Sequence, residues 1–551
     1  LTKRRRKGNV AFPPSFAFPP TVPVGWGCDG ATREGNAFRA TPHHSMGSAS
    51  TGTALSHLLS CGTTRYVSPP PAGTPHEVKE KKKMNTTPDS SPVQQGVAEA
   101  TSESPQLARG LSLRHIMFIA LGSAIGTGLF YGSASAIQLA GPSVLLAYVI
   151  GGAAVFMVMR AMGELALAHP VSGAFSEYAT RYLGRWAGFV TGWTYALEMA
   201  LVAIADVTAF AVYMKFWFPN SPSWIWIISV LLILLAINLA KVKAFGETEF
   251  WFTLVKVSAI IAMIVGGVVL LFVGVQAHDS VAPSVTNLWA LEGGFFANGF
   301  TGFLACFTVV MFAFGGIENI GIAAGEAKDP RTSIPKAIRT VPFRILIFYI
   351  LTLSVIMSLY PWYSVTKANS PFVQIFEGLG IPAAASILNV VIITAAISAL
   401  NADVYGAGRM MYGLAKQNLA PASFAKVTKN GAPWMTTLIM VLVMAVGVIV
   451  NVLFENAFEV VASLATFATV FVWVMILLAH IAFKRSGADT EAQPVRQPLW
   501  LSYMALAFMV FIVVLFGCFA DTQLALVMGA LWCLFLLGYY RLVVVRARSE
   551  A

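Results

Sequence analysis

Long runs of apolar residues, separated by short polar connections, dominate the sequence from residue 113 onward. A run of about 17 or more residues, folded as a helix, is long enough to cross a hydrocarbon core of about 30 Å. The pattern therefore predicts an all-α integral membrane protein with 12 transmembrane helices. The runs cover residues 113–139, 143–163, 186–218, 224–240, 249–275, 298–323, 343–360, 383–405, 437–454, 460–483, 500–519 and 524–545.

The composition argues against an ordinary soluble domain. Hydrophobic residues make up 56% of the chain and charged residues only 11%, whereas a soluble globule has about 25% charged residues. Most of the protein surface must therefore face something other than water, and we expect it to face a lipid bilayer.

The basic residues indicate an orientation. Every second connection between the runs is rich in Lys and Arg, whereas the remaining connections contain only Lys215 and Lys367. Because cytoplasmic connections retain Lys and Arg, we predict that both termini are cytoplasmic, which an even number of crossings allows.

Residues 1–108 differ from the rest of the chain. They are rich in Pro, Gly, Ser and Thr, contain a basic run from Lys79 to Lys83, and show no helix or strand period. We expect them to be disordered. One interpretation is that residues 1–83 are translated upstream sequence, in which case a chain begun at Met84 should insert and transport as the full chain does. The alternative is a basic arm that contacts anionic lipid or nucleic acid.

The sequence lacks the usual signatures of enzymes and ATP-driven pumps. It contains no nucleotide-binding loop, no nucleophile elbow and no zinc spacing. The five cysteines form neither a metal-type spacing nor a disulfide framework. We therefore expect no catalytic residues, no metal and no cofactor, and we predict that the chain is not an enzyme.

Two of the apolar runs contain segments that are poor helix formers. Residues 122–128 of the first run read GSAIGTG, and residues 314–321 of the sixth run read FGGIENIG. An unwound stretch at membrane depth is tolerated where it lines a polar cavity. Two interrupted helices five runs apart predict a 5+5 inverted repeat with broken helices 1 and 6, followed by two C-terminal helices.

The chemistry of two such breaks suits an amino acid. Freed backbone N–H groups at the start of a half-helix can bind a carboxylate, and freed carbonyls with the Glu318 carboxylate can bind an ammonium. The alternative for either break alone is close helix packing through glycine.

Several motifs resemble the amino acid permeases of the amino acid, polyamine and organocation superfamily. They are GSAIGTGLF at 122–130, FGETEFW at 245–251, GGIE at 315–318, GEAKDP at 325–330 and IPKAI at 334–338. The resemblance covers about residues 109–548, and residues 203–210, 370–372 and 463–469 are most similar to bacterial proline-specific and histidine permeases.

The resemblance implies proton-coupled uptake of a small amino acid across a bacterial inner membrane, with no nucleic-acid partner. It implies that the substrate carboxylate binds Ser123, Ala124, Ile125, Gly126, Thr127 and Gly128. The amino end would bind Phe314, Gly315, Gly316, Ile317 and Glu318, which would also gate the pocket. Lys256 would act in place of a bound sodium ion, and Asn319 departs from the aliphatic residue expected there.

Other ionisable residues are candidates for proton coupling. Lys256 lies well inside its run, where an ammonium needs acceptors unless it snorkels to the headgroups; we expect carbonyls around Gly122 and the hydroxyl of Ser398. Glu198 and Asp206 are spaced to share one helical face, so they form part of a proton path or pair with polar neighbours. Five further expectations concern Glu164, Glu247 and Glu249 as solvated or salt-bridged, Glu326 in an inside gate with an arginine, Asn401 as a polar partner of Lys256, and His480 as a packed side chain.

Three functions remain open on this evidence. The first is a secondary active symporter of a proline- or histidine-type substrate. The second is an amino acid exchanger, and the third is a permease-like sensor that binds the amino acid without net flux.

Overall fold

The computed structural model describes residues 110–171, 173–238, 242–275, 281–428, 433–454, 456–487 and 494–545. The predictions for residues 1–108 lie outside these residues and stay predictions.

The described part of the chain is helical, and its one β feature is an isolated bridge between Leu111 and Ala327. The helices are α1 (Leu113–Ala124), α2 (Ser133–Ala140), α3 (Val144–Ala168), α4 (Ala174–Leu183), α5 (Arg185–Lys215), α6 (Ser223–Asn238), α7 (Val242–Val273), α8 (Asn287–Ala290), α9 (Gly299–Val310), α10 (Asn319–Ala324), α11 (Pro330–Leu359), α12 (Pro371–Gly378), α13 (Pro382–Lys416), α14 (Trp434–Leu453), α15 (Ala457–Arg485), α16 (Leu499–Cys518) and α17 (Ala520–Tyr539).

Within the described residues, ten helical segments are long and apolar enough to cross a membrane. The first of them, Leu113–Ala168, covers the first two predicted runs, because only short irregular turns separate α1, α2 and α3. The fourth predicted run corresponds to α6, which is apolar but has only 16 residues. The chain is thus a multi-pass membrane protein, whereas the count of twelve crossings stays a prediction.

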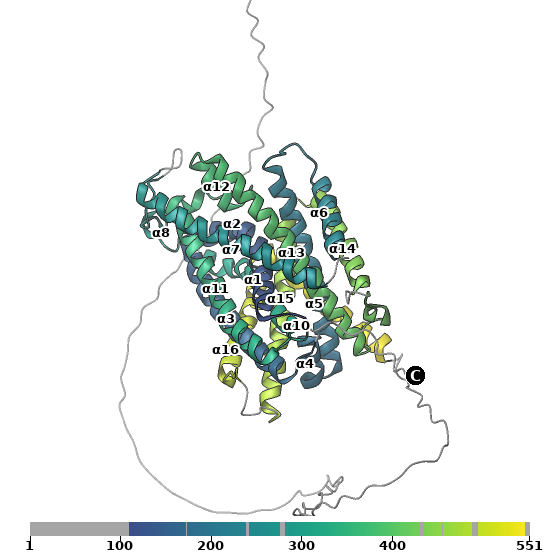
Figure 1. Ribbon diagram of the computed structural model, residues 1–551. Helices are drawn as coiled ribbons and strands as arrows, with labels where there is room; N and C mark the ends of the chain where they lie inside the picture. The colour runs from purple at the N-terminus through teal and green to yellow at the C-terminus, as the bar shows by residue number, and fades with distance from the viewer. Residues whose placement is uncertain are drawn as a thin grey trace, which may run out of the picture. The chain divides into compact units, whose positions relative to one another are not determined.

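Burial separates the central helices from the peripheral ones. α5 packs against α4, α13, α14 and α15, and 72% of its most apolar stretch is buried. The corresponding figure for Ala520–Leu542 is only 17%. Exposed side chains of the outer helices include Phe272, Leu453 and Trp500, which suit a surface that faces lipid. In Figure 1, α1, α10 and α15 lie among the other helices, with α3, α11 and α16 on one side and α6 and α14 on the other.

The short helix α4 was not expected from the sequence, because it is amphipathic rather than uniformly apolar. Its buried face contains Phe175 and Tyr178, and it packs against α5 and α15. Gly184 ends α4 with φ 102°, a conformation that favours glycine. α4 therefore closes one end of the bundle without crossing it.

Candidate functional site

The first helix break lies between α1 and the π-helical turn Gly128–Gly132. α1 ends at Ala124, and Ile125 leaves the helical conformation with φ −88° and ψ 81°. A Cβ atom at Gly128 would lie 2.7 Å from the Cα of Ala313. The break thus falls where the chain passes very close to a second backbone, which a glycine permits.

Side chains from two other helices bind the carbonyl oxygens that this break exposes. The Lys256 ammonium, from α7, donates to the oxygen of Gly122 at 2.6 Å and to that of Ile125 at 3.1 Å. The Tyr349 hydroxyl, from α11, lies 2.8 Å from the oxygen of Ala124. Because Lys256 is completely buried, it does not snorkel to the headgroups in this conformation.

The second break follows α9 and the 3-10 turn Phe312–Phe314. Gly316 has φ 86°, and a Cβ there would lie 2.6 Å from the Ser123 hydroxyl oxygen. The Gly316 N–H donates to Glu318 Oε1 at 3.0 Å, and the Trp473 indole N–H donates to Glu318 Oε2 at 3.3 Å. Glu318 therefore stabilises the local backbone turn in the described conformation.

Asn319 joins the two breaks. Its amide nitrogen donates to the Ser123 hydroxyl at 2.8 Å, and its amide oxygen accepts a hydrogen bond from the Tyr195 hydroxyl at 2.9 Å. The Tyr349 hydroxyl also contacts both breaks, since it lies 2.5 Å from the oxygen of Ala313. The residue that departs from the expected aliphatic type is thus the one that hydrogen-bonds across the site.

A cavity of about 20 Å³ lies between the breaks. One water molecule needs roughly 10–15 Å³ of such volume, so the site is closed around a space much smaller than an amino acid. The lining residues are Ser123, Ala124, Gly126, Thr127, Gly128, Val202, Asp206, Phe312, Gly315, Gly316, Ala399 and Asp403. Of the residues expected to bind substrate, Ile125, Phe314, Ile317 and Glu318 are not in this lining.

Phe314 does not lie at the cavity, contrary to the expectation that it gates the pocket. Its ring packs against Tyr148 and Tyr349, at centroid distances of 5.9 and 5.5 Å. Phe312, two residues earlier, lines the cavity instead. The reason is the 3-10 turn, in which residues two positions apart point in different directions.

Buried carboxyl groups surround the Lys256 ammonium. Glu249, Asp206 and Asp403 each act electrostatically on it, and Asp206 also accepts a hydrogen bond from the Thr127 hydroxyl. Sequence reasoning missed Asp403, although an ionisable residue inside an apolar run is a functional candidate by itself. It also placed Glu249 in a solvated or salt-bridged position, whereas this side chain is completely buried.

Ser398 is not the acceptor expected for Lys256. Its hydroxyl donates to Glu249 Oε1, and the hydrogen bonds of the ammonium go to Gly122 and Ile125. The physical reason is that a deprotonated carboxylate is a stronger acceptor than another hydroxyl. Asn401 accepts a hydrogen bond from Asn238 at 3.0 Å.

Glu198 lies on the other side of the second break. It is completely buried, and its Oε1 accepts a hydrogen bond from the Thr469 hydroxyl at 2.7 Å. Its carboxyl group also interacts with that of Glu318. The spacing of Glu198 and Asp206 in the sequence thus leads to two separate polar groups, one beside each break.

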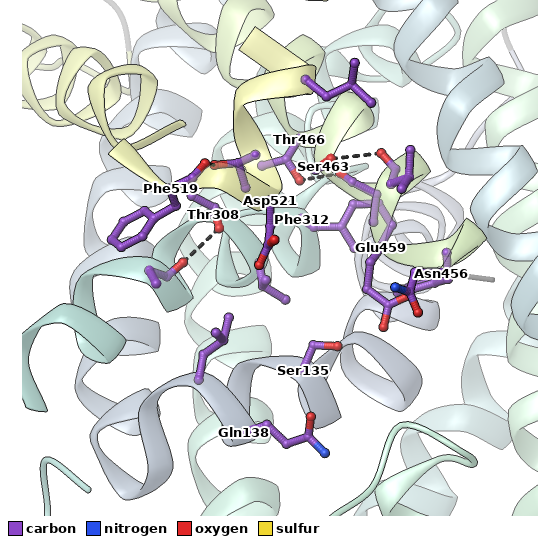
Figure 2. Close-up of a pocket in the computed structure, with 18 of the residues that line it drawn as sticks. Ser135, Gln138, Thr308, Phe312, Asn456, Glu459, Ser463, Thr466, Phe519 and Asp521 are labelled. Carbon is purple, nitrogen blue, oxygen red and sulfur yellow. Dashed lines mark hydrogen bonds between the residues drawn. The ribbon is translucent and has the colours of Figure 1, made fainter. Parts of the chain in front are cut away.

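A second and much larger cavity, of about 710 Å³, adjoins the site. Figure 2 shows Ser135, Gln138, Thr308 and Asp521 among its polar lining residues. Phe312 lines both cavities, and its ring meets the edge of the Phe458 ring at 5.8 Å. These aromatic side chains therefore separate the chamber from the midplane cavity.

At the opposite ends of α1 and α10, the chain is closed by backbone and side-chain contacts. The Leu111 N–H donates to the oxygen of Glu326 at 3.1 Å, and the Lys328 N–H donates to the oxygen of Leu111 at 3.0 Å. The Glu326 carboxylate accepts a hydrogen bond from Arg409 Nε at 2.8 Å, and both side chains are buried. This is the kind of glutamate–arginine contact expected for Glu326.

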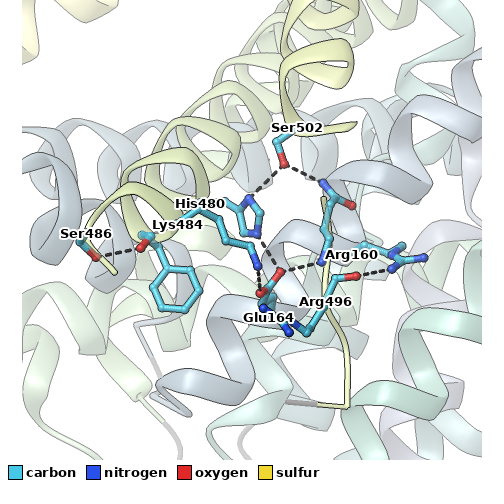
Figure 3. Close-up of polar contacts among 9 residues, drawn as sticks. Arg160, Glu164, His480, Lys484, Ser486, Arg496 and Ser502 are labelled. Carbon is cyan, nitrogen blue, oxygen red and sulfur yellow. Dashed lines mark hydrogen bonds and ion pairs between the residues drawn. The ribbon is translucent and has the colours of Figure 1, made fainter. Parts of the chain in front are cut away.

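Glu164 belongs to a buried network away from the site. His480 Nε2 lies 2.9 Å from its Oε2, the Lys484 ammonium contacts its Oε1, and the Gln497 N–H donates to it at 2.8 Å. Figure 3 shows His480 and Lys484 converging on this carboxylate. Glu164 is therefore salt-bridged but not solvated, whereas Glu247 is partly exposed and paired with Arg114.

A multi-pass membrane protein in which two broken helices enclose a small polar cavity belongs to the class of carrier-type transporters. The profile of one family, described as amino acid permease, matches residues 115–549. The chain belongs to the amino acid permease family. It is an amino acid transporter and not an enzyme.

Curated relatives match the chain over most of their own length. The uncharacterized amino acid permease YtnA of Bacillus subtilis is 46% identical over 79% of this chain and 95% of that protein. The uncharacterized transporter YdgF of Bacillus subtilis is 43% identical over 79% of this chain and 95% of that protein. The aromatic amino acid transport protein AroP of Escherichia coli K12 is 44% identical over 80% of this chain and 97% of that protein.

Proposed function

We propose that this chain imports an amino acid by proton symport through alternating access. The proposal includes twelve crossings with a 5+5 inverted repeat, two additional C-terminal helices, and both termini in the cytoplasm of a bacterial cell. The observation that carries it is the buried Lys256 ammonium on the exposed carbonyls of one break, which faces a second break across a small cavity.

The substrate would bind as a zwitterion between the breaks. Backbone N–H groups at the start of the half-helix that begins at Gly128 would receive the carboxylate, since that end of a helix favours negative charge. Carbonyls near Gly315 and the carboxylate of Glu318 would receive the ammonium. Because the described cavity is too small for this ligand, binding requires the second break and Phe312 to move outward.

Proton movement would involve Lys256 and its carboxyl neighbours. A buried ammonium that has acceptors in one conformation and loses them in another links its charge to the conformational switch. Asp206 lies beside this group, and Glu198 beside the second break, so each offers a second route for the proton. Ser398 would act indirectly, through its hydrogen bond to Glu249.

The substrate has two sets of candidates. The segments at 203–210, 370–372 and 463–469 favour a proline- or histidine-type amino acid. The similarity to AroP, whose name states aromatic amino acid transport, favours an aromatic one. Glycine and alanine residues at Gly126, Gly315 and Ala399 leave room beside the backbone for either class once the cavity opens.

Uptake into proteoliposomes tests the proposal. Competition among the twenty amino acids identifies the substrate, and a step to acidic pH outside should drive its accumulation against a gradient. Counterflow without net uptake would indicate an exchanger instead. Binding with neither accumulation nor counterflow would indicate a sensor.

A further inference from the structure

A small basic cavity lies apart from the transport site. It has a volume of about 70 Å³ and is lined by Arg160, Ile338, Arg339, Pro494, Val495 and Arg496. Three of these six residues are arginines and none is acidic. Since one water molecule needs roughly 10–15 Å³ of such volume, the cavity has room for the four oxygen atoms of a phosphate group.

The backbone of residues 494–496 holds two of the arginines in place. Arg339 Nη2, from α11, donates to the oxygen of Pro494 at 2.8 Å, and Arg160 Nη2, from α3, donates to the oxygen of Arg496. Figure 3 shows this contact between Arg160 and Arg496. Each guanidinium has five N–H donors, so most donors of Arg160 and Arg339 are not used by these bonds.

The charge of the cavity is not neutralised by nearby carboxylates in the described part of the chain. Arg160 and Arg339 form no ion pair with any described residue. Glu164, one helical turn after Arg160, is already bound by Lys484, His480 and the Gln497 N–H. In addition, Arg160 Nε is buried without a hydrogen-bond partner. Such an orphaned donor is costly unless an acceptor binds it.

The surroundings of the cavity favour a ligand with an apolar part. Phe343 follows Arg339 by one helical turn and is 62% exposed, and Trp500, four residues after Arg496, is 63% exposed. The arginines lie in the last turns of α3, the first turns of α11 and the approach to α16, where spanning segments reach the headgroup level. Basic pockets between membrane helices at this level suit lipid phosphates.

From this geometry we infer that Arg160, Arg339 and Arg496 form a binding site for a phosphate group, carried by an anionic phospholipid whose acyl chain lies along Phe343 and Trp500. The phosphate would join α3 to α11 through the segment before α16. Guanidinium groups suit this role because they bind phosphate oxygens in pairs.

Lipid titration of the full chain in a neutral detergent tests the site. Thermal unfolding midpoints are measured against added phosphatidylglycerol, phosphatidylcholine and inorganic phosphate, and give an apparent affinity for each. We expect phosphatidylglycerol to stabilise the protein more than phosphatidylcholine does. The double variant Arg160→Gln/Arg339→Gln should bind phosphatidylglycerol about tenfold more weakly, and the single variant Arg496→Gln provides the same test if the double variant does not fold.

Arg344→Gln is the matched control, because Arg344 is exposed on the same helix and does not line the cavity. Its affinity should equal that of the unaltered chain. Stabilisation by inorganic phosphate that matches phosphatidylglycerol and is lost in the same variants would support the site and assign it to a soluble anion. The inference is overturned if the cavity variants bind phosphatidylglycerol normally, or if Arg344→Gln loses as much affinity as they do.

Discussion

The break after α1 is held by side chains from other helices, whereas the break after α9 is held mainly by its own residues. Lys256 and Tyr349 bind the carbonyls of the first break. Gly316 and Glu318 form the second break by a glycine conformation and a bond between near neighbours. The first break can therefore respond to a change of charge elsewhere, while the second depends on local backbone geometry.

The largest effect is expected from Gly316→Ala, which attacks that local geometry. A side chain at φ 86° is strained by roughly 1–2 kcal/mol, and its Cβ would also lie 2.9 Å from the backbone oxygen of Ser123. Transport should fall at least about 100-fold, because small displacements of a binding site have effects of this order. The measurement is initial uptake rate per inserted protein.

The control for this change is Gly132→Ala. A Cβ at Gly132 would meet nothing closer than 3.8 Å, although the residue also belongs to a broken helix. This variant should retain most of its uptake. Equal loss in both variants would mean that the glycines act through general helix stability.

Lys256→Met tests whether the first break is the one that responds to charge. The variant removes the donor to Gly122 and Ile125, so accumulation driven by an imposed pH gradient should disappear. Substrate binding should stay within about tenfold of normal, because the direct lining of the cavity is unchanged. The exposed Lys215 gives the control Lys215→Met, which should accumulate normally.

If Lys256→Met still concentrates substrate when the outside is acidic, the lysine does not couple the proton. Asp206 and Glu198 then become the better candidates. The difference between the two breaks would in that case be structural only.

Glu318→Gln tests how far the second break depends on its own carboxylate. The change keeps one oxygen for the Gly316 N–H but removes the negative charge that receives that donor, the Trp473 N–H and a substrate ammonium. Substrate affinity should fall roughly tenfold, as measured by competition binding. Glu377→Gln, at an exposed position of α12, should leave the affinity unchanged.

Tyr349→Phe is expected to have the smallest effect, although its hydroxyl contacts both breaks. The ring packing is retained, and the loss of one buried donor costs about 1–3 kcal/mol. The unfolding temperature should fall by a few degrees with uptake reduced only several-fold. Tyr363→Phe is the exposed control, and an effect of Tyr349→Phe as large as that of Gly316→Ala would contradict the idea that the second break is held locally.

Sequence patterns located the helices and the breaks because both depend on local composition. The third predicted run, 186–218, corresponds to α5 within a few residues. α11 begins at Pro330 rather than near residue 343, since its first turns are polar outside while Ile334 and Ile338 are buried. Hydropathy alone does not detect such a partly amphipathic beginning.

Side-chain partners were harder to predict because they depend on how helices are rotated against one another. The acceptor at Gly122 followed from the exposed carbonyls of the first break, and the structure contains that bond. The choice between Phe312 and Phe314, and between Lys256 and Glu249 as partner of Ser398, depends on tertiary geometry that spacing does not encode. Asp403 could have been found from the sequence by its charge within an apolar run.

The midplane cavity of about 20 Å³ also has an electrical consequence. It holds one or two water molecules at most, and Phe312 lies between it and the larger chamber. A proton or sodium ion that follows the transmembrane voltage needs a continuous file of water or polar partners, and constrictions without water block that file. An empty carrier in this conformation is therefore an insulator, so many copies can reside in one membrane without dissipating the voltage that drives uptake.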